Sequence, residues 1–116
     1  MIVEERIYSL VIGKAPEFLA LYEAEGLAIQ RPILGRMVGY FTSEIGPLNQ
    51  IVHMWAYRDE AERNERRARL AADPRWKDFV KKIRPLQISQ ENKILRPAPF
   101  SPWSTDDPAL DMAATD

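Results

Sequence analysis

With 116 residues, no cysteine and 16 basic against 17 acidic side chains, the chain has the length of one domain and cannot form disulfides, a thiol nucleophile or thiolate metal sites. Its net charge of −1 argues against nucleic acid as a partner, because a balanced chain gains little from displacing phosphate counterions. No apolar run approaches the ~20 residues that a membrane helix needs, and the N-terminus lacks the features of a secretory leader, so we expect a cytoplasmic protein without a membrane partner.

Periodicity and turn residues predict six elements along the chain. Strand segments alternate between two kinds of side chain, and helix segments repeat apolar side chains every three to four residues. The expected elements are strands over residues 2–12, 34–44, 48–57 and 86–95, and helices over residues 16–30 and 59–83.

The first helix contains residues that disfavour a helix. Gly26 weakens it by about 1 kcal/mol relative to alanine. Arg31-Pro32 is expected to end it, because the residue before a proline is pushed out of the α region. In the strand that follows, Gly35 and Gly39 predict a bulge or a close backbone approach.

The second helix is expected to begin with Asp59 as its cap and to bend or restart at Asp73-Pro74. We interpret its arginines, which alternate with glutamates, as a solvated and ion-paired face. These arginines are Arg63, Arg66, Arg67 and Arg69. Its alanines are expected to face the sheet. Two alternatives follow: large sheet aromatics fill the room above them, or a slot remains that forms a small apolar ligand pocket.

The order β-α-β-β-α-β is that of the ferredoxin-like split motif, an α+β fold. Its four-stranded antiparallel sheet carries both helices on one face. The other face needs a cover, and the simplest cover is a second copy of the same sheet, which makes a dimeric α/β barrel. Because the strand over residues 86–95 has a polar face, this interface is expected to be partly polar or wet.

Glu4, Arg6 and Tyr8 share one face of the first strand, where buried charges would need partners. In the functional interpretation, Arg6 holds a carboxylate or enolate oxygen and Tyr8 donates a hydrogen bond or a proton. In the alternative, Glu4 and Arg6 form an ion pair at a sheet edge or dimer seam, and Tyr8 is a core aromatic.

His53 shares a face with Ile51, Trp55 and Tyr57. It is a candidate general base beside Tyr8, or a haem ligand, with Trp55, Tyr57 and Trp76 lining a ligand pocket next to Glu4 and Arg6. The alternative is a half-buried histidine with a structural hydrogen bond. A lone histidine without cysteine does not make a usual zinc site, so no metal and no cofactor is expected.

Several segments together resemble the NIPSNAP family. They come from both helices and all four strands, and the resemblance covers residues 1 to about 100. The segments are Glu4-x-Arg6-x-Tyr8-x-Leu10, Gly13-Lys14, Pro16-Glu17-Phe18, and residues 39–49, 52–57, 73–76 and 90–95. The resemblance implies a homodimeric α/β barrel of ferredoxin-like protomers and supplies no agreed catalytic residues.

We therefore expect a NIPSNAP-like ferredoxin-fold domain over residues 1–96, followed by a proline-rich tail over residues 97–116 that is extended to disordered. A small apolar or anionic organic molecule is expected to bind between sheet and helices of a homodimer or a higher homo-oligomer. A cofactor-independent oxygenase, isomerase or lyase reaction is one extension. The alternatives are haem binding and a non-catalytic scaffold or protein-interaction module.

Overall fold

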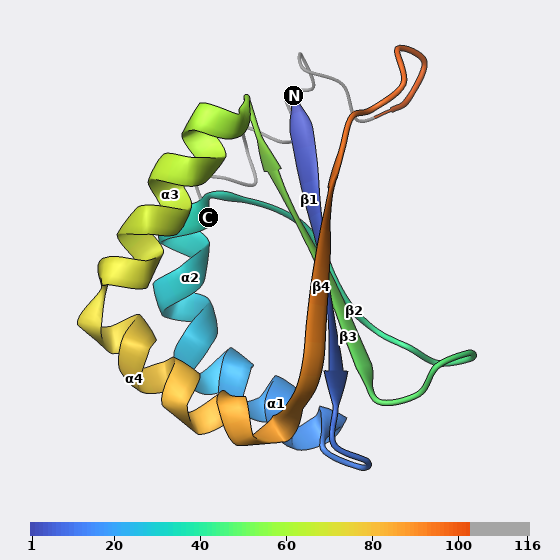
Figure 1. The fold of residues 1–116 in the computed structure, drawn as a ribbon, viewed down its shortest axis with the longest axis vertical. Helices are drawn as coiled ribbons and strands as arrows, with labels where there is room; N and C mark the ends of the chain where they lie inside the picture. The colour runs from blue at the N-terminus through green and yellow to red at the C-terminus, as the bar shows by residue number, and fades with distance from the viewer. Residues whose placement is uncertain (103–116) are drawn as a thin grey trace.

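The computed structural model describes residues 1–102, and a four-stranded antiparallel sheet carries its helices on one face (Figure 1). The strands are β1 (Ile2–Leu10), β2 (Arg36–Thr42), β3 (Gln50–Tyr57) and β4 (Gln87–Leu95). The helical elements are α1 (Ala15–Leu21), the π-helix η1 (Tyr22–Gly26), α2 (Leu27–Leu34), α3 (Glu60–Ala72), α4 (Pro74–Ile83) and the 3₁₀ turn η2 (Arg84–Leu86). The strand order β2-β3-β1-β4 confirms the predicted ferredoxin-like α+β fold.

β1 lies in the middle of the sheet, between β3 and β4, and is antiparallel to both. Residues opposite each other in such a pair project to the same face. The β1–β3 pairs on the helix-covered face are Glu4 and Trp55, Arg6 and His53, and Tyr8 and Ile51. The predicted site residues of the two strands therefore lie side by side under the helices.

The space between sheet and helices is filled mainly by aromatic and aliphatic side chains. One buried cluster joins the end of β1 and the start of β3 to α1, the π-helix and α4. Its members are Tyr8, Leu10, Phe18, Tyr22, Ile51, Phe79, Ile83 and Leu86. A second lies under α2 and α3: Ile2, Leu34, Trp55, Tyr57 and Leu70. Burial of these side chains supplies the main driving force for the fold.

The prediction that Arg31-Pro32 ends the first helix is wrong, because α2 continues through Pro32 to Leu34. It ends at Gly35, whose φ of +91° glycine adopts without strain. The burial of Leu34 and its neighbours against the sheet compensates for the hydrogen bond that proline cannot donate. Here tertiary packing outweighs a local preference.

The second helix begins and breaks where expected. The Oδ1 of Asp59 accepts the N–H of Glu62 at 2.8 Å, which caps α3. Asp73 caps α4 in the same way, accepting the N–H of Arg75 at 2.9 Å, and Pro74 takes the first helical position. These contacts confirm the predicted cap and the predicted restart.

The predicted orientation of α3 is wrong. The residues that face the sheet are charged, apart from Leu70: Glu62, Arg63, Arg66 and Arg67. The alanines that were expected to face the sheet are exposed: Ala61, Ala68, Ala71 and Ala72. Large sheet aromatics, Trp55 and Tyr57, do lie buried beside Leu70, but no alanines lie above them. The carboxylate of Glu4 binds Arg63 and Arg67 and holds that face of the helix inward.

The face of the sheet opposite the helices has no helix over it among residues 1–102 (Figure 1). Val3 and Ala56 are its buried members, with Val38 and Met54 packed beside them. The β2–β3 register shifts between Met37 and Gly39, which confirms the predicted bulge at Gly39. The placement of Gly35 in this strand is wrong, because Gly35 ends α2. We call this surface the open face, defined by Val3, Val38, Met54, Ala56 and the exposed Phe41.

The C-terminal part of the chain is described only as far as residue 102. β4 ends at Leu95, and most of the tail predicted over residues 97–116 lies outside the described residues, so that domain boundary stays a prediction. Within residues 1–102, every helix is too short or too polar to cross a membrane.

Gly26 provides a test of the packing between η1 and α4. A Cβ at this position would lie 2.7 Å from the Phe79 ring and 2.9 Å from the Tyr22 ring. We expect Gly26→Ala to destabilise the protein by about 1–3 kcal/mol, although alanine is the better helix former. Urea unfolding measures this. Phe79→Leu should relieve the clash in a double variant, and a stabilised Gly26→Ala protein would contradict the packing.

Candidate functional site

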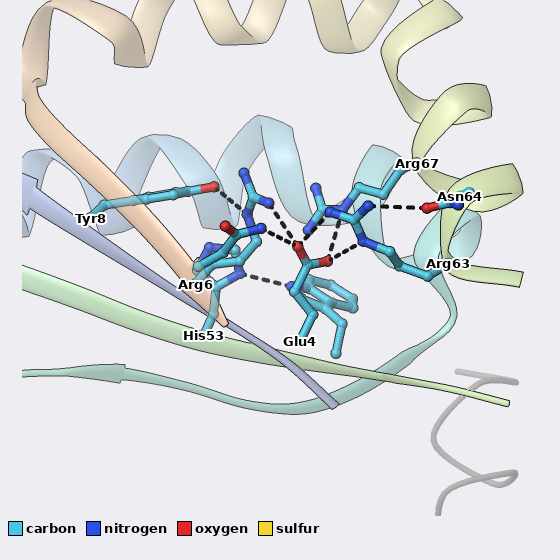
Figure 2. Close-up of polar contacts among 9 residues, drawn as sticks. Glu4, Arg6, Tyr8, His53, Arg63, Asn64 and Arg67 are labelled. Carbon is cyan, nitrogen blue, oxygen red and sulfur yellow. Dashed lines mark hydrogen bonds and ion pairs between the residues drawn. The ribbon is translucent and has the colours of Figure 1, made fainter. Parts of the chain in front are cut away.

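The carboxylate of Glu4 is fully buried beneath α3, where four side chains donate hydrogen bonds to it (Figure 2). Arg63 binds both oxygens, with its Nη2 at 2.8 Å and its Nε at 3.2 Å. Arg67 Nε lies at 3.3 Å and Arg6 Nη1 at 3.1 Å. Asn92 Nδ2, from β4, donates at 2.8 Å. We call Glu4, Arg6, Arg63 and Arg67 the arginine site.

The arginine site carries an excess of positive charge. Burial by itself raises the pKa of Glu4, but the bond from Arg63, the charge of Arg67, the bond from Asn92 and the charge of Arg6 together lower it to about 2. Glu4 is therefore ionised at neutral pH and balances only one of three guanidinium groups. The side chains of Arg6, Arg63 and Arg67 are 17%, 26% and 18% exposed, so the excess charge reaches solvent.

Tyr8 connects the arginine site to the aromatic interior. Its hydroxyl oxygen accepts a hydrogen bond from Arg6 Nε at 3.0 Å, and its ring lies edge-on to His53 with centroids 4.9 Å apart. The Glu4–Arg6 ion pair of the alternative interpretation is present, at 3.1 Å. It lies under α3, however, and the two additional arginines make it part of a larger cationic centre.

His53 is buried and neutral. The indole N–H of Trp55 donates to Nδ1 of His53 at 2.7 Å. Since an indole nitrogen can only donate, Nδ1 carries no proton and the imidazole proton is on Nε2. Burial lowers the pKa of His53, and the charges of Arg6 and Arg67 lower it further, to about 3. This pKa makes His53 a poor general base at neutral pH and a neutral N–H donor.

A small, partly open cavity adjoins His53. Its volume of about 10 Å³ has room for about one water molecule. Tyr40 stacks on the His53 ring at 4.6 Å and on the Tyr22 ring at 4.5 Å, and Tyr22 donates to Gln30 at 2.6 Å. The residues that line the cavity are Tyr8, Phe18, Tyr22, Gln30, Tyr40, His53, Trp76 and Ile83. A porphyrin is far larger than this space, so the structure gives the haem interpretation of His53 no support.

Three further residues were predicted to line a ligand pocket, and only one of them borders the cavity. Trp76 is half-buried and lines the cavity. Trp55 is fully buried and acts through His53, and Tyr57 is also fully buried. Burial raises the pKa of the Tyr57 hydroxyl, and the guanidinium of Arg67 opposes this. The Tyr57 hydroxyl thus lies beside the guanidinium of Arg67, although the two do not meet strict hydrogen-bond geometry.

Sequence reasoning missed Arg63, Arg67 and Asn92 as site residues. Arg63 and Arg67 are four residues apart, so they share a helix face, but that signal also fits a solvated face. Glu4 precedes Arg63 by 59 residues and Asn92 by 88. A single sequence contains no signal for contacts at such separations.

A second buried carboxylate, that of Glu62, lies on the sheet-facing side of α3 and binds other arginines there. Glu62 accepts from Arg36 Nη1 at 3.0 Å and from the backbone N–H of Arg58 at 2.7 Å, and Arg66 Nε lies 3.7 Å from it. Arg66 also donates to the carbonyl of Ile33 at 3.0 Å. These contacts join α2, β2 and the start of α3, which indicates a structural role.

This combination of fold and site defines a ferredoxin-like α+β protein with a cationic centre between its central strand and a covering helix. The NIPSNAP family model matches residues 3–102. The chain belongs to the NIPSNAP family, as the sequence resemblance implied.

Curated relatives match most of this chain. A NipSnap homologue from Dictyostelium discoideum is 35% identical over 94 residues, which is 81% of this chain and 41% of that protein. Human NipSnap homolog 3A is 34% identical over 99 residues, which is 84% of this chain and 39% of the human protein. The chain thus spans about two-fifths of the length of these relatives.

Solved structures agree with the fold. An uncharacterized NIPSNAP-like domain protein from Burkholderia xenovorans is 55% identical, with a TM-score of 0.87 over 89% of this chain and 90% of that one. A NIPSNAP family protein with unknown function from Agrobacterium tumefaciens is also 55% identical, with a TM-score of 0.86 over 88% and 92%. A putative antibiotic biosynthesis monooxygenase from Nitrosomonas europaea, 15% identical with a TM-score of 0.60 over 83% and 97%, shares the fold alone.

The depressed pKa of His53 predicts how stability depends on pH. The unfolded chain protonates His53 below about pH 6.5, whereas the folded protein does so only near pH 3, so protons favour unfolding between these values. The free energy of unfolding should therefore fall with pH by up to about 1.4 kcal/mol per pH unit below pH 6.5. Glu4 acts in the same direction below about pH 4.5.

Urea unfolding at pH 6.5, 5.5 and 4.5 measures this dependence. His53→Gln, which does not titrate, should flatten it across this range. Equal slopes for the wild type and His53→Gln would show that His53 is protonated in the folded protein.

Proposed function

We propose that this protein binds a small organic anion at the arginine site. The observation that carries the proposal is the excess of guanidinium charge around the single buried carboxylate of Glu4. Guanidinium groups bind carboxylates through charge-assisted hydrogen bonds, which strengthen where water is partly excluded. The partly exposed guanidinium of Arg67, which is 18% exposed, extends this excess charge toward solvent, where such a ligand can approach.

The reaction that we propose for a bound ligand is cofactor-independent and begins from an enolisable carbonyl compound, as in an oxygenase, isomerase or lyase. Arg6 would stabilise a developing enolate oxygen, and water would take the proton that leaves the carbon, because Glu4 and His53 are both weak bases. Tyr8 accepts from Arg6 at 3.0 Å and so keeps its own O–H proton available for transfer. His53 would contribute as a neutral donor and not as the base that the sequence suggested.

Binding of pentanoate and benzoate, followed by NMR titration at constant ionic strength, tests the proposal. Arg67→Ala should weaken binding about tenfold, because it removes one of the two excess charges. Arg69→Ala is the matched control: it removes the same charge from the same helix, but Arg69 is exposed and pairs with Glu65. That variant should bind as the wild type does.

Two results would contradict the proposal. One is the absence of carboxylate binding by the wild type at millimolar concentration; the other is an equal loss in Arg67→Ala and Arg69→Ala. The first result would favour the alternative function, a non-catalytic scaffold whose arginines serve only to hold α3 on the sheet.

We also propose that two copies pair through the open face into a homodimeric barrel, the form that the sequence predicted. Val3 and Ala56 are its buried members, Val38 and Met54 pack beside them, and the exposed Phe41 extends it. A sheet face with apolar side chains and no covering element favours burial against a partner. Higher homo-oligomers and a cytoplasmic location stay predictions.

Sedimentation velocity tests the pairing. The wild type should have the mass of two chains at micromolar concentration, and Met54→Glu should separate them, because it places a charge in the open face. Ile45→Glu introduces the same side chain at an exposed residue between β2 and β3 and should leave the dimer intact. A monomeric wild type would refute the proposed barrel.

A further inference from the structure

His53 presents a buried hydrogen-bond donor that has no acceptor among residues 1–102. The bond from Trp55 Nε1 to Nδ1, at 2.7 Å, assigns the ring proton to Nε2. His53 is 1% exposed, and its Nε2 has no hydrogen-bond partner within the described part of the chain. Since an unpaired buried donor is costly, this position favours an oxygen atom as its acceptor.

The surroundings of the His53 ring show where that acceptor would lie. Tyr40 stacks on the ring at 4.6 Å, the Tyr8 ring contacts it edge-on at 4.9 Å, and the Nδ1 edge faces Trp55. The cavity of about 10 Å³ borders His53 but not Trp55, so it lies away from the Nδ1 edge of the ring, on the side where Nε2 is available. This space is large enough for one oxygen atom with its hydrogen bond.

Tyr8 lies between this cavity and the arginine site. Its ring lines the cavity, and its hydroxyl oxygen accepts from Arg6 at 3.0 Å. In Figure 2, Tyr8, Arg6 and His53 lie on one side of the Glu4 carboxylate, and Arg63 and Arg67 lie on the other. Tyr8 alone thus separates the arginine site, which can bind a carboxylate, from the N–H of His53, which can donate to a carbonyl oxygen.

We propose that the arginine site and His53 together select an oxo-carboxylate. The carboxylate binds the excess guanidinium charge of the arginine site, and the ligand's carbonyl oxygen accepts the Nε2–H of His53 in the cavity. Trp55 is a positioning residue, because its N–H holds His53 in the tautomer that can donate there. This inference rests on the proposed anion binding, and the Tyr8 ring has to move for the carbonyl oxygen to reach His53.

The pair 4-oxopentanoate and pentanoate isolates the contribution of the carbonyl, since the two acids differ only in the ketone. NMR titration of the wild type should show 4-oxopentanoate binding about fivefold more tightly, the size expected for one hydrogen bond. Trp55→Phe keeps His53 but removes the donor to Nδ1, so the preference for the oxo acid should fall close to one. Arg67→Ala should weaken both acids by the same factor and leave the preference unchanged.

A second readout does not depend on ligand binding. ¹⁵N spectra of the ligand-free protein with labelled histidine should show Nε2 protonated and Nδ1 unprotonated, and Trp55→Phe should give a mixture of tautomers. A proton on Nδ1 in the wild type would overturn the inference. So would equal affinities for the two acids, which would leave the proposed anion binding in place. Failure of both acids to bind would refute both proposals.

Discussion

The burial of the Glu4 carboxylate beneath α3 is the constraint on which the rest of this structure depends. An ionised group without water needs charged or hydrogen-bonding partners, and Glu4 takes them from three elements: its own strand, α3 and β4. The same contacts turn the arginine-bearing side of α3 toward the sheet. One buried carboxylate thereby orients a helix and joins β1 to β4, the last strand among residues 1–102.

The number of arginines exceeds what Glu4 needs for neutrality, and the excess charge acts on its surroundings. It keeps Glu4 ionised well below neutral pH and, together with burial, keeps His53 uncharged. Two groups that usually carry or exchange protons are thus each held in one state. What remains for chemistry is the binding of negative charge, the hydroxyl proton of Tyr8 and a neutral N–H donor on His53.

Membership of the NIPSNAP family accounts for the fold of this chain but does not identify a reaction. The related structures have almost the same length as the described domain, whereas the curated relatives are more than twice as long. The monooxygenase-like neighbour shows that this backbone occurs in proteins of other families, and fold alone does not carry function. The function of this chain therefore has to be argued from the arginine site and from His53 with its indole partner.

The sequence by itself determined the order of strands and helices, the cap at Asp59, the restart at Asp73-Pro74 and the shared face of Glu4, Arg6 and Tyr8. These features follow from local rules, namely side-chain alternation and short-range hydrogen bonds between neighbouring residues.

Only the tertiary structure decided that α2 continues past Pro32, that Gly26 makes room for Phe79, and that Arg63 and Arg67 face the sheet. The tautomer of His53 likewise depends on the orientation of the Trp55 indole. In each case a local preference competes with a contact between distant parts of the chain. The contact prevails because a buried charge or a close-packed ring costs more to leave unsatisfied than a helix costs to bend or turn.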